Sequence, residues 1–248
     1  MSGHSKWAEI KRQKGANDVG KGALFTKLAR EIQVAAREGG GDPEANFRLR
    51  LAIQKARENN MPADNIKRSI DKATGAAGAD QLEEITYEGY GPGGAAVMVQ
   101  AMTDNRNRTV AEVRGAFTRA GGSLGESGSV AWQFEQRGII AVQAGKQDPD
   151  EIALLAIDAG AEDVKTEDGV VEVYTPLDAF EQVRAALAAQ NLAIEHAEAT
   201  MLPTTPIELD DEKATAVLKL VDRLENLDDV QKVYTNVEFA ESVLEAVG

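Results

Sequence analysis

The residue types best suited to chemistry in this sequence gather close to its N-terminus. Several cations surround a single tryptophan there, and the set is His4, Ser5, Lys6, Trp7, Lys11, Arg12 and Lys14. Cationic side chains neutralise phosphates and release counterions, an indole stacks on an unpaired base, and a hydroxyl contacts a phosphate oxygen. The cluster therefore predicts contact with nucleic acid. The alternative is a solvated tail whose tryptophan packs on the core.

Further cations follow at helical spacing. Leu28 and Ile32 belong to one apolar helix face, and the cations of the same segment lie opposite. A later helix turns Ile66 and Ile70 inward and its basic residues outward. The residues that these helices add to the predicted nucleic-acid-binding set are Lys21, Lys27, Arg30, Lys67 and Arg68. Ordinary solvated helix faces would explain the same pattern.

A second polar cluster spans residues 104–109. Asparagine and threonine favour helix starts, where backbone N–H groups point at anions. Two arginines add positive charge at the same place, so the cluster predicts a second anion site made of Asn105, Arg106, Arg108 and Thr109. A capped helix start with exposed arginines is an equally good interpretation, and both stay open.

The sequence shows no convincing pattern of catalytic residues. His4 and His196 are the only histidines and cysteine is absent, so neither a zinc site nor a histidine-based nucleophilic centre is convincing. Residues 89–94 match G-x-G-x-x-G, but an apolar strand follows where a dinucleotide site needs a helix, so we predict a hairpin turn. We predict a non-enzymatic protein with no catalytic residue, no cofactor and no metal.

Charge divides the chain into two parts. Residues 1–75 hold 15 lysines and arginines against 9 aspartates and glutamates, and the remainder holds 12 against 32. Because screening in cells acts over about 8 Å, a polyanion responds to the basic head and not to the net charge of −14. Cysteine is absent, and we find neither a secretory signal nor an apolar run of membrane-spanning length. We therefore expect a cytoplasmic protein with no membrane partner.

The elements that must position these residues follow from periodicity. We predict three helices in the head: one from about Lys21, one with Asp42 as N-cap and Pro43 in first position, and one from Pro62 to Gly75. After the linker 76–79 the period changes to two, which indicates strands. The alternation of Val130, Trp132 and Phe134 predicts one of them.

The order of elements then predicts the architecture. Residues 138–200 read β-α-β-β-α-β, which is the ferredoxin-like order. A final helix and strand complete the earlier β-β-α-β segment, so the ferredoxin-like unit is an insertion. The predicted fold class is α+β multidomain: an N-terminal three-helix domain followed by two α/β sandwich domains, the second ferredoxin-like and inserted into the first. The predicted boundaries are 1–78 for the basic helical domain, 79–136 plus 204–248 for the middle domain, and 137–203 for the insertion.

Ordered motifs along the whole chain resemble those of the YebC family. They include GHSKW at residues 3–7, FTKL at 25–28, DPEAN at 42–46, YEGYGPGG at 87–94, TDNRNRT at 103–109 and GSVAW at 128–132. The resemblance implies three domains with a helical head. It also implies a cytoplasmic protein of the kind described as a probable DNA-binding transcriptional regulator, with mitochondrial relatives described as translational activators of a cytochrome oxidase subunit.

Three functions follow, of which the first two share nucleic acid as partner. One is a DNA-binding transcriptional regulator, although no helix-turn-helix is evident. The second is a ribosome-associated translation factor that binds ribosomal RNA and relieves stalled translation. A long basic arm with one stacking aromatic suits RNA shape and phosphate recognition better, so physical reasoning favours it. The third is a small-molecule enzyme in the α/β domains, which predicts a pocket of convergent polar groups there.

Overall fold

In the part of the chain that the structure describes, the head of the molecule is a bundle of three helices. A computed structural model describes residues 18–75, 82–167, 169–240 and 242–244. The head helices are α2 (Asp18–Gly39), α3 (Phe47–Glu58) and α4 (Ala63–Thr74), in that order along the chain. Leu28 and Ile32 of α2 pack with Leu49 and Ile53 of α3 and with Ile66 of α4. The apolar positions predicted from periodicity thus form the core of the head.

The second helix begins later than the sequence predicted. Asp42 and Pro43 lie in a turn, where the Asp42 carboxylate accepts the N–H of Glu44 at 2.9 Å. Asn46 is the N-cap of α3, because its side-chain oxygen accepts the N–H of Leu49 at 3.0 Å. Its amide nitrogen donates to Ala35 O at 2.7 Å, which ties the end of α2 to the start of α3. The buried Asn46 side chain, which bonds to both helices, therefore caps α3 in place of the predicted Asp42.

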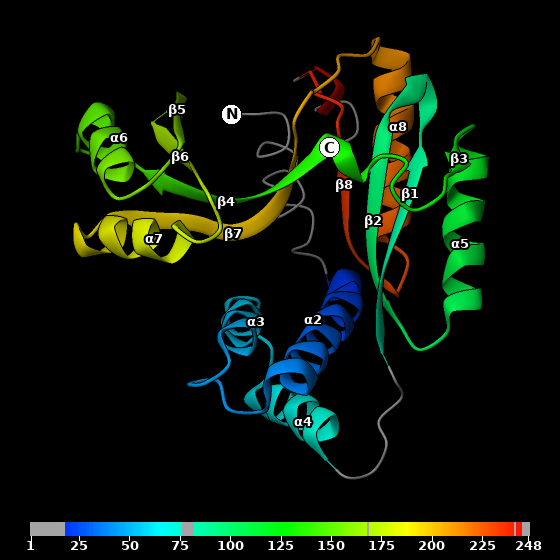
Figure 1. The fold of residues 1–248 in the computed structure, drawn as a ribbon, viewed down its shortest axis with the longest axis horizontal. Coiled ribbons are helices and arrows are strands. Elements are labelled where there is room, and N and C mark those ends of the chain that lie inside the picture. The colour runs from blue at the N-terminus through cyan, green and yellow to red at the C-terminus, as the bar shows by residue number, and fades with distance from the viewer. Residues whose placement is uncertain (1–17, 76–81, 168, 241, 245–248) are drawn as a thin grey trace.

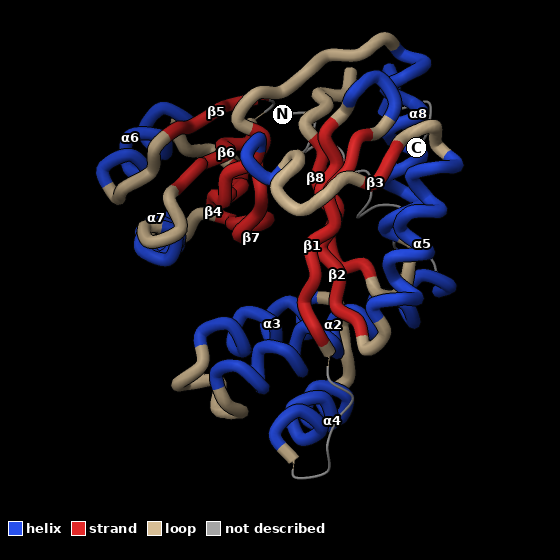
Figure 2. Tube along the Cα trace, turned by 45° about the vertical axis from the view of Figure 1, so that its right-hand side comes forward, coloured by secondary structure: helices blue, strands red, loops and turns tan. Residues whose placement is uncertain are grey.

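The middle domain is a four-stranded antiparallel sheet with helices on one side. Its strands have the order β3-β1-β2-β8, and α5 and α8 lie on one side of the sheet in both ribbon views (Figures 1 and 2). The elements are β1 (Glu83–Tyr90), β2 (Ala96–Thr103), α5 (Arg106–Arg119), β3 (Ser123–Leu124), α8 (Asp211–Glu225) and β8 (Val230–Thr235). Val97, Val99, Phe117 and Leu220 form the core beneath these helices.

The glycine-rich segment 89–94 is a hairpin turn, as predicted. β1 and β2 pair antiparallel up to Tyr90 opposite Ala96, with a short 3₁₀ turn at Pro92–Gly94 between them. Gly93 and Gly94 have φ values of 70° and 80°, which a side chain would strain. Because a strand follows this turn, the segment lacks the helix that a dinucleotide site needs.

The inserted domain has the predicted ferredoxin-like order. Its sheet reads β5-β6-β4-β7, with β4 paired antiparallel to both β6 and β7. The elements are β4 (Phe134–Gln143), α6 (Pro149–Asp158), β5 (Asp163–Glu167), β6 (Val170–Thr175), α7 (Phe180–Ala189) and β7 (Ala193–Pro203). Ile140, Val171 and Leu187 belong to its separate core. We propose that the insertion spans residues 137–203 and the middle domain residues 79–136 plus 204–248. These boundaries lie near the start of β4 and at the end of β7.

The strand predicted around Trp132 is wrong. Residues Ala131–Gln133 form a 3₁₀ turn, and β4 starts only at Phe134. The backbone N–H groups of Gly128, Val130 and Ala131 all donate to the Glu88 carboxylate, so they are not available for a sheet. The turn leaves the Trp132 side chain 72% exposed.

Candidate nucleic-acid interface

The predicted N-terminal cluster lies outside the residues that the structure describes. Its members are His4, Ser5, Lys6, Trp7, Lys11, Arg12 and Lys14, and the side chain of Lys21 at the start of α2 is not described either. The geometry of the head therefore bears on Lys27, Arg30, Lys67 and Arg68, which the structure does place.

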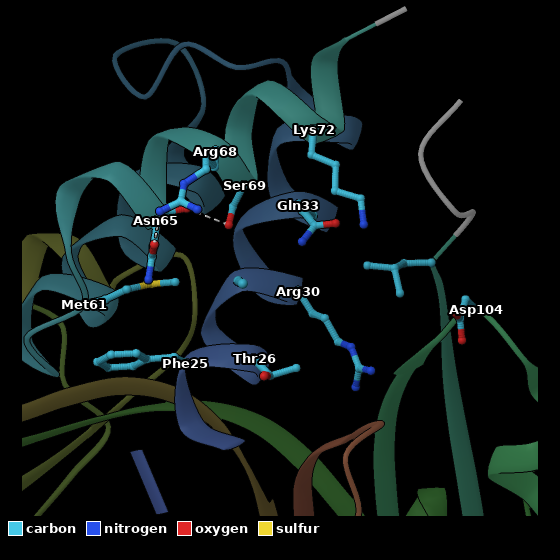
Figure 3. A pocket seen from close by; sticks show the side chains of 12 residues that line it. Phe25, Thr26, Arg30, Gln33, Met61, Asn65, Arg68, Ser69, Lys72 and Asp104 are labelled. Atoms are coloured by element: carbon cyan, nitrogen blue, oxygen red, sulfur yellow. Dashed lines mark hydrogen bonds between the residues drawn. The ribbon is translucent and has the colours of Figure 1, made fainter. Parts of the chain in front are cut away.

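A groove of about 440 Å³ runs between α2 and α4. Its basic part contains Arg68 and Lys72 of α4 and Arg30 of α2, and the acidic Asp104 of the middle domain lies beyond Arg30 (Figure 3). Its apolar part contains Phe25 and Met61. One groove thus offers apolar surface and cationic groups within the dimensions of an ordinary ligand site.

Arg68 is held in the groove by uncharged acceptors. Its Nε donates to the backbone oxygen of Asp64 at 3.2 Å, and one terminal nitrogen donates to Asn65 Oδ1 at 2.7 Å. These hydrogen bonds orient the guanidinium without neutralising it. Lys67 precedes it on α4 and is exposed. The outward direction predicted for both residues agrees with this placement, and the arrangement suits a phosphate approaching α4.

Lys27 and Arg30 do not form the open face that the sequence predicted. Lys27 Nζ donates at 2.5 Å to the backbone oxygen of Glu225, in the last turn of α8. Arg30 donates to the backbone oxygen of Asp228 and forms an ion pair with Asp229 at 3.1 Å. The last carbonyl groups of a helix attract cations, so these two residues fasten the head to the middle domain. The contact joins residues far apart in sequence, which periodicity within one helix does not reveal.

The predicted second anion site is occupied by a carboxylate of the chain itself. Arg108 lies 2.7 Å from Asp229 and 2.8 Å from Asp104, and the Thr109 hydroxyl lies 2.7 Å from Asp229. Asn105 caps α5 by accepting the N–H of Arg108 at 3.1 Å. The capped helix start was therefore the better of the two interpretations for these residues. Arg106 stays exposed, 3.6 Å from Glu83.

Asp229 is the residue that sequence reasoning missed. Its side chain is 1% exposed and is contacted by Arg30 of the head and by Arg108 of the middle domain. Burial alone would raise its pKa, but hydrogen bonds from Arg108, Thr109 and Thr103 outweigh burial and hold the pKa of this carboxyl below its usual value. One aspartate among 41 acidic residues carries no signal of its own in the sequence.

Neither a metal-binding cluster nor a membrane-spanning helix occurs in the described part of the chain. No group of three or more histidines, cysteines, aspartates and glutamates there is arranged to hold a metal ion. No helix among the described residues has the length and hydropathy to cross a bilayer.

The fold and the groove together define a class of α+β protein. Its helical head carries a groove lined by basic residues and is joined to two domains that each contain a sheet. Residues 5–76 match the model of the TACO1/YebC protein N-terminal domain, and residues 82–237 match that of the TACO1/YebC second and third domain. The chain therefore belongs to the TACO1/YebC family.

Relatives and a solved structure agree with this assignment. A relative from Herpetosiphon aurantiacus is 56% identical over 99% of this chain and 98% of its own length, and one from Chloroflexus aggregans is 55% identical with the same coverage. Both are named probable transcriptional regulatory proteins. The crystal structure of a conserved hypothetical protein from Aquifex aeolicus aligns with a TM-score of 0.81 and 48% identity, covering 90% of this chain and 93% of that one.

Proposed function

We propose that this protein is a non-enzymatic regulator of gene expression whose head binds single-stranded or looped RNA. The α2/α4 groove is the observation that supports this proposal. Its apolar part, with Phe25 and Met61, suits the face of an unpaired base, and its basic part, with Arg68 and Lys72, suits the adjoining phosphate. Ribosomal RNA, rich in looped structure, is the target class that we propose.

Direct regulation through duplex DNA is the second candidate, and the names of the relatives favour it. A helix that reads bases in the major groove projects from the protein surface. The basic residues of α4 instead share a concavity with α2, and Arg30 within that concavity is paired with Asp229. The concave arrangement favours extruded bases over a duplex, so we place RNA first.

The groove is tested by removing its two α4 cations together. We expect Arg68→Ala combined with Lys72→Ala to weaken binding to a single-stranded RNA roughly 10- to 100-fold. The slope of log affinity against log salt should fall by about 0.7 for each phosphate that the variant no longer neutralises. Fluorescence anisotropy with labelled RNA at several salt concentrations measures both quantities.

Two comparisons complete the experiment. Arg57→Ala removes one exposed cation from α3, away from the groove, and should leave the affinity almost unchanged. A duplex DNA of equal length should bind more weakly than the RNA. An unchanged salt slope in the double variant would remove the groove from the interface, and tighter binding to the duplex would favour the DNA-binding candidate.

A further inference from the structure

Two exposed aromatic side chains form a platform on the middle domain, outside the basic head. Trp132 is 72% exposed and Tyr90 is 38% exposed. The Trp132 Nε1 donates to the backbone oxygen of Ser129 at 3.1 Å, and the Tyr90 hydroxyl donates to the same oxygen at 2.9 Å. One carbonyl group thus fixes both rings.

The loop beneath the platform is held by a buried carboxylate. Glu88 is 4% exposed and accepts the N–H groups of Gly128, Val130 and Ala131 at 2.7, 2.8 and 2.7 Å. Val130 is fully buried next to the exposed tryptophan. The chain therefore holds the indole outward by its own hydrogen bonds, and a ligand that stacks on it meets a surface already ordered for binding.

The charges around the platform restrict the kind of ligand. Glu126 belongs to the same loop and is exposed, whereas Glu135, three residues after Trp132, is already ion-paired with Arg137 at 2.9 Å. Residues 76–248 as a whole hold 32 acidic residues against 12 basic ones. We therefore expect the site to disfavour a polyanion, whereas a cation gains from the Glu126 carboxylate and from the indole face, which is the best aromatic partner for a cation.

We propose that Trp132, Tyr90 and the loop 125–133 form a docking site for an arginine-bearing, basic peptide segment of a protein partner. A guanidinium is planar and weakly hydrated, so it stacks on the indole, while the exposed Glu126 pairs with a neighbouring cation of the peptide. Tryptophan and tyrosine are enriched among the residues that dominate binding at protein interfaces. The site is separate from the groove in the head. It places a protein partner on the acidic part of the molecule, residues 76–248.

Fluorescence gives a direct test, because the chain has only two tryptophans. In a Trp7→Phe variant of the full chain, all indole emission comes from Trp132. A synthetic peptide of alternating arginine and glycine should quench that emission saturably. A matched lysine–glycine peptide should bind more weakly, and a uridine oligonucleotide should not compete at this site.

Affinity for the labelled arginine peptide should fall roughly 3- to 30-fold in Trp132→Ala, the range of a partly desolvated cation–π contact. Trp132→Phe should give an intermediate affinity, and Glu126→Gln should weaken the salt dependence. Leu154→Ala, which removes another exposed apolar side chain on α6 of the inserted domain, is the control and should bind normally. Equal affinity of Trp132→Ala and the parent would overturn the proposal. Quenching by the uridine oligonucleotide, or by self-association at higher protein concentration, would overturn it as well.

Discussion

Replacing Asp229 with asparagine should lower the free energy of unfolding by about 2–4 kcal/mol. The substitution removes the charge that faces Arg30 and Arg108 and turns an amide N–H₂ toward groups that donate to the carboxylate. Removing one partner of a buried ion pair costs about 3–5 kcal/mol, and we expect somewhat less because Arg108 keeps Asp104. Thermal unfolding should show a midpoint lower by roughly 5–10 °C.

The same contact should couple the head to the middle domain. A double-mutant cycle between Asp229→Asn and Arg30→Met should give a coupling free energy of at least about 1 kcal/mol. Glu112→Gln, which neutralises an exposed carboxylate on α5, is the matched control and should change stability by less than about 0.5 kcal/mol. If Asp229→Asn lowered the free energy of unfolding by less than about 0.5 kcal/mol, the Asp229 carboxylate would not be what joins the head to the middle domain.

The contribution of Asp229 should depend on pH in a defined direction. Because the folded-state pKa of Asp229 lies below the unfolded value of about 3.9, its stabilisation is fully present above that value. Stabilisation is lost as the pH falls through the folded-state pKa. Urea unfolding of the parent and of Asp229→Asn should therefore differ by a constant amount above about pH 5 and should converge below it. A gap that widens on acidification would contradict this assignment.

Replacing Glu88 with glutamine should be about equally destabilising, by roughly 3 kcal/mol. Three backbone N–H groups donate to this carboxylate, and hydrogen bonds to a charged acceptor are worth about 1.5–3 kcal/mol each. Burial would raise the pKa of Glu88, but these three bonds outweigh it and lower the pKa, so the carboxylate is charged at neutral pH. An amide has one oxygen and places an N–H₂ against the remaining donors.

The effect of Glu88→Gln should be visible in the loop itself as well as in global stability. In the Trp7→Phe background, the fluorescence anisotropy of Trp132 should fall, because the turn that fixes the indole loosens. Urea unfolding provides the global measurement, and Glu112→Gln again provides the control. Normal anisotropy together with normal stability would show that the three N–H groups do not depend on the Glu88 charge.

Local patterns predicted most of the helices and strands, their order and the insertion. The apolar spacing of Leu28 and Ile32, and the β-α-β-β-α-β order of residues 138–200, depend on neighbours within one element or one unit. Predictions failed where another side chain competes for the backbone N–H groups. Glu88 takes the N–H groups that a strand at Trp132 would need, and Asn46 takes the capping role from Asp42.

The candidate site shows the same division. The outward direction of Lys67 and Arg68 follows from the periodicity of α4 alone, and the structure agrees with it. The partners of Lys27 and Arg30 are 198 residues away in sequence, so no window along the chain contains both sides of the contact. Charge identifies residues that can bind anions, but only the tertiary fold shows that Lys27 donates to a backbone carbonyl and that Arg30 pairs with the buried Asp229.

The insertion also fixes the order in which the body can form during synthesis. Val97 of β2 pairs with Thr235 of β8, and the whole ferredoxin-like unit lies between them. On a growing chain, the inserted unit is complete and able to fold while β2 still presents an unsatisfied edge of N–H and C=O groups. The middle domain closes last, when α8 and β8 emerge, and Asp229 arrives in that same segment. Attachment of the head through Arg30 therefore cannot precede the synthesis of this segment.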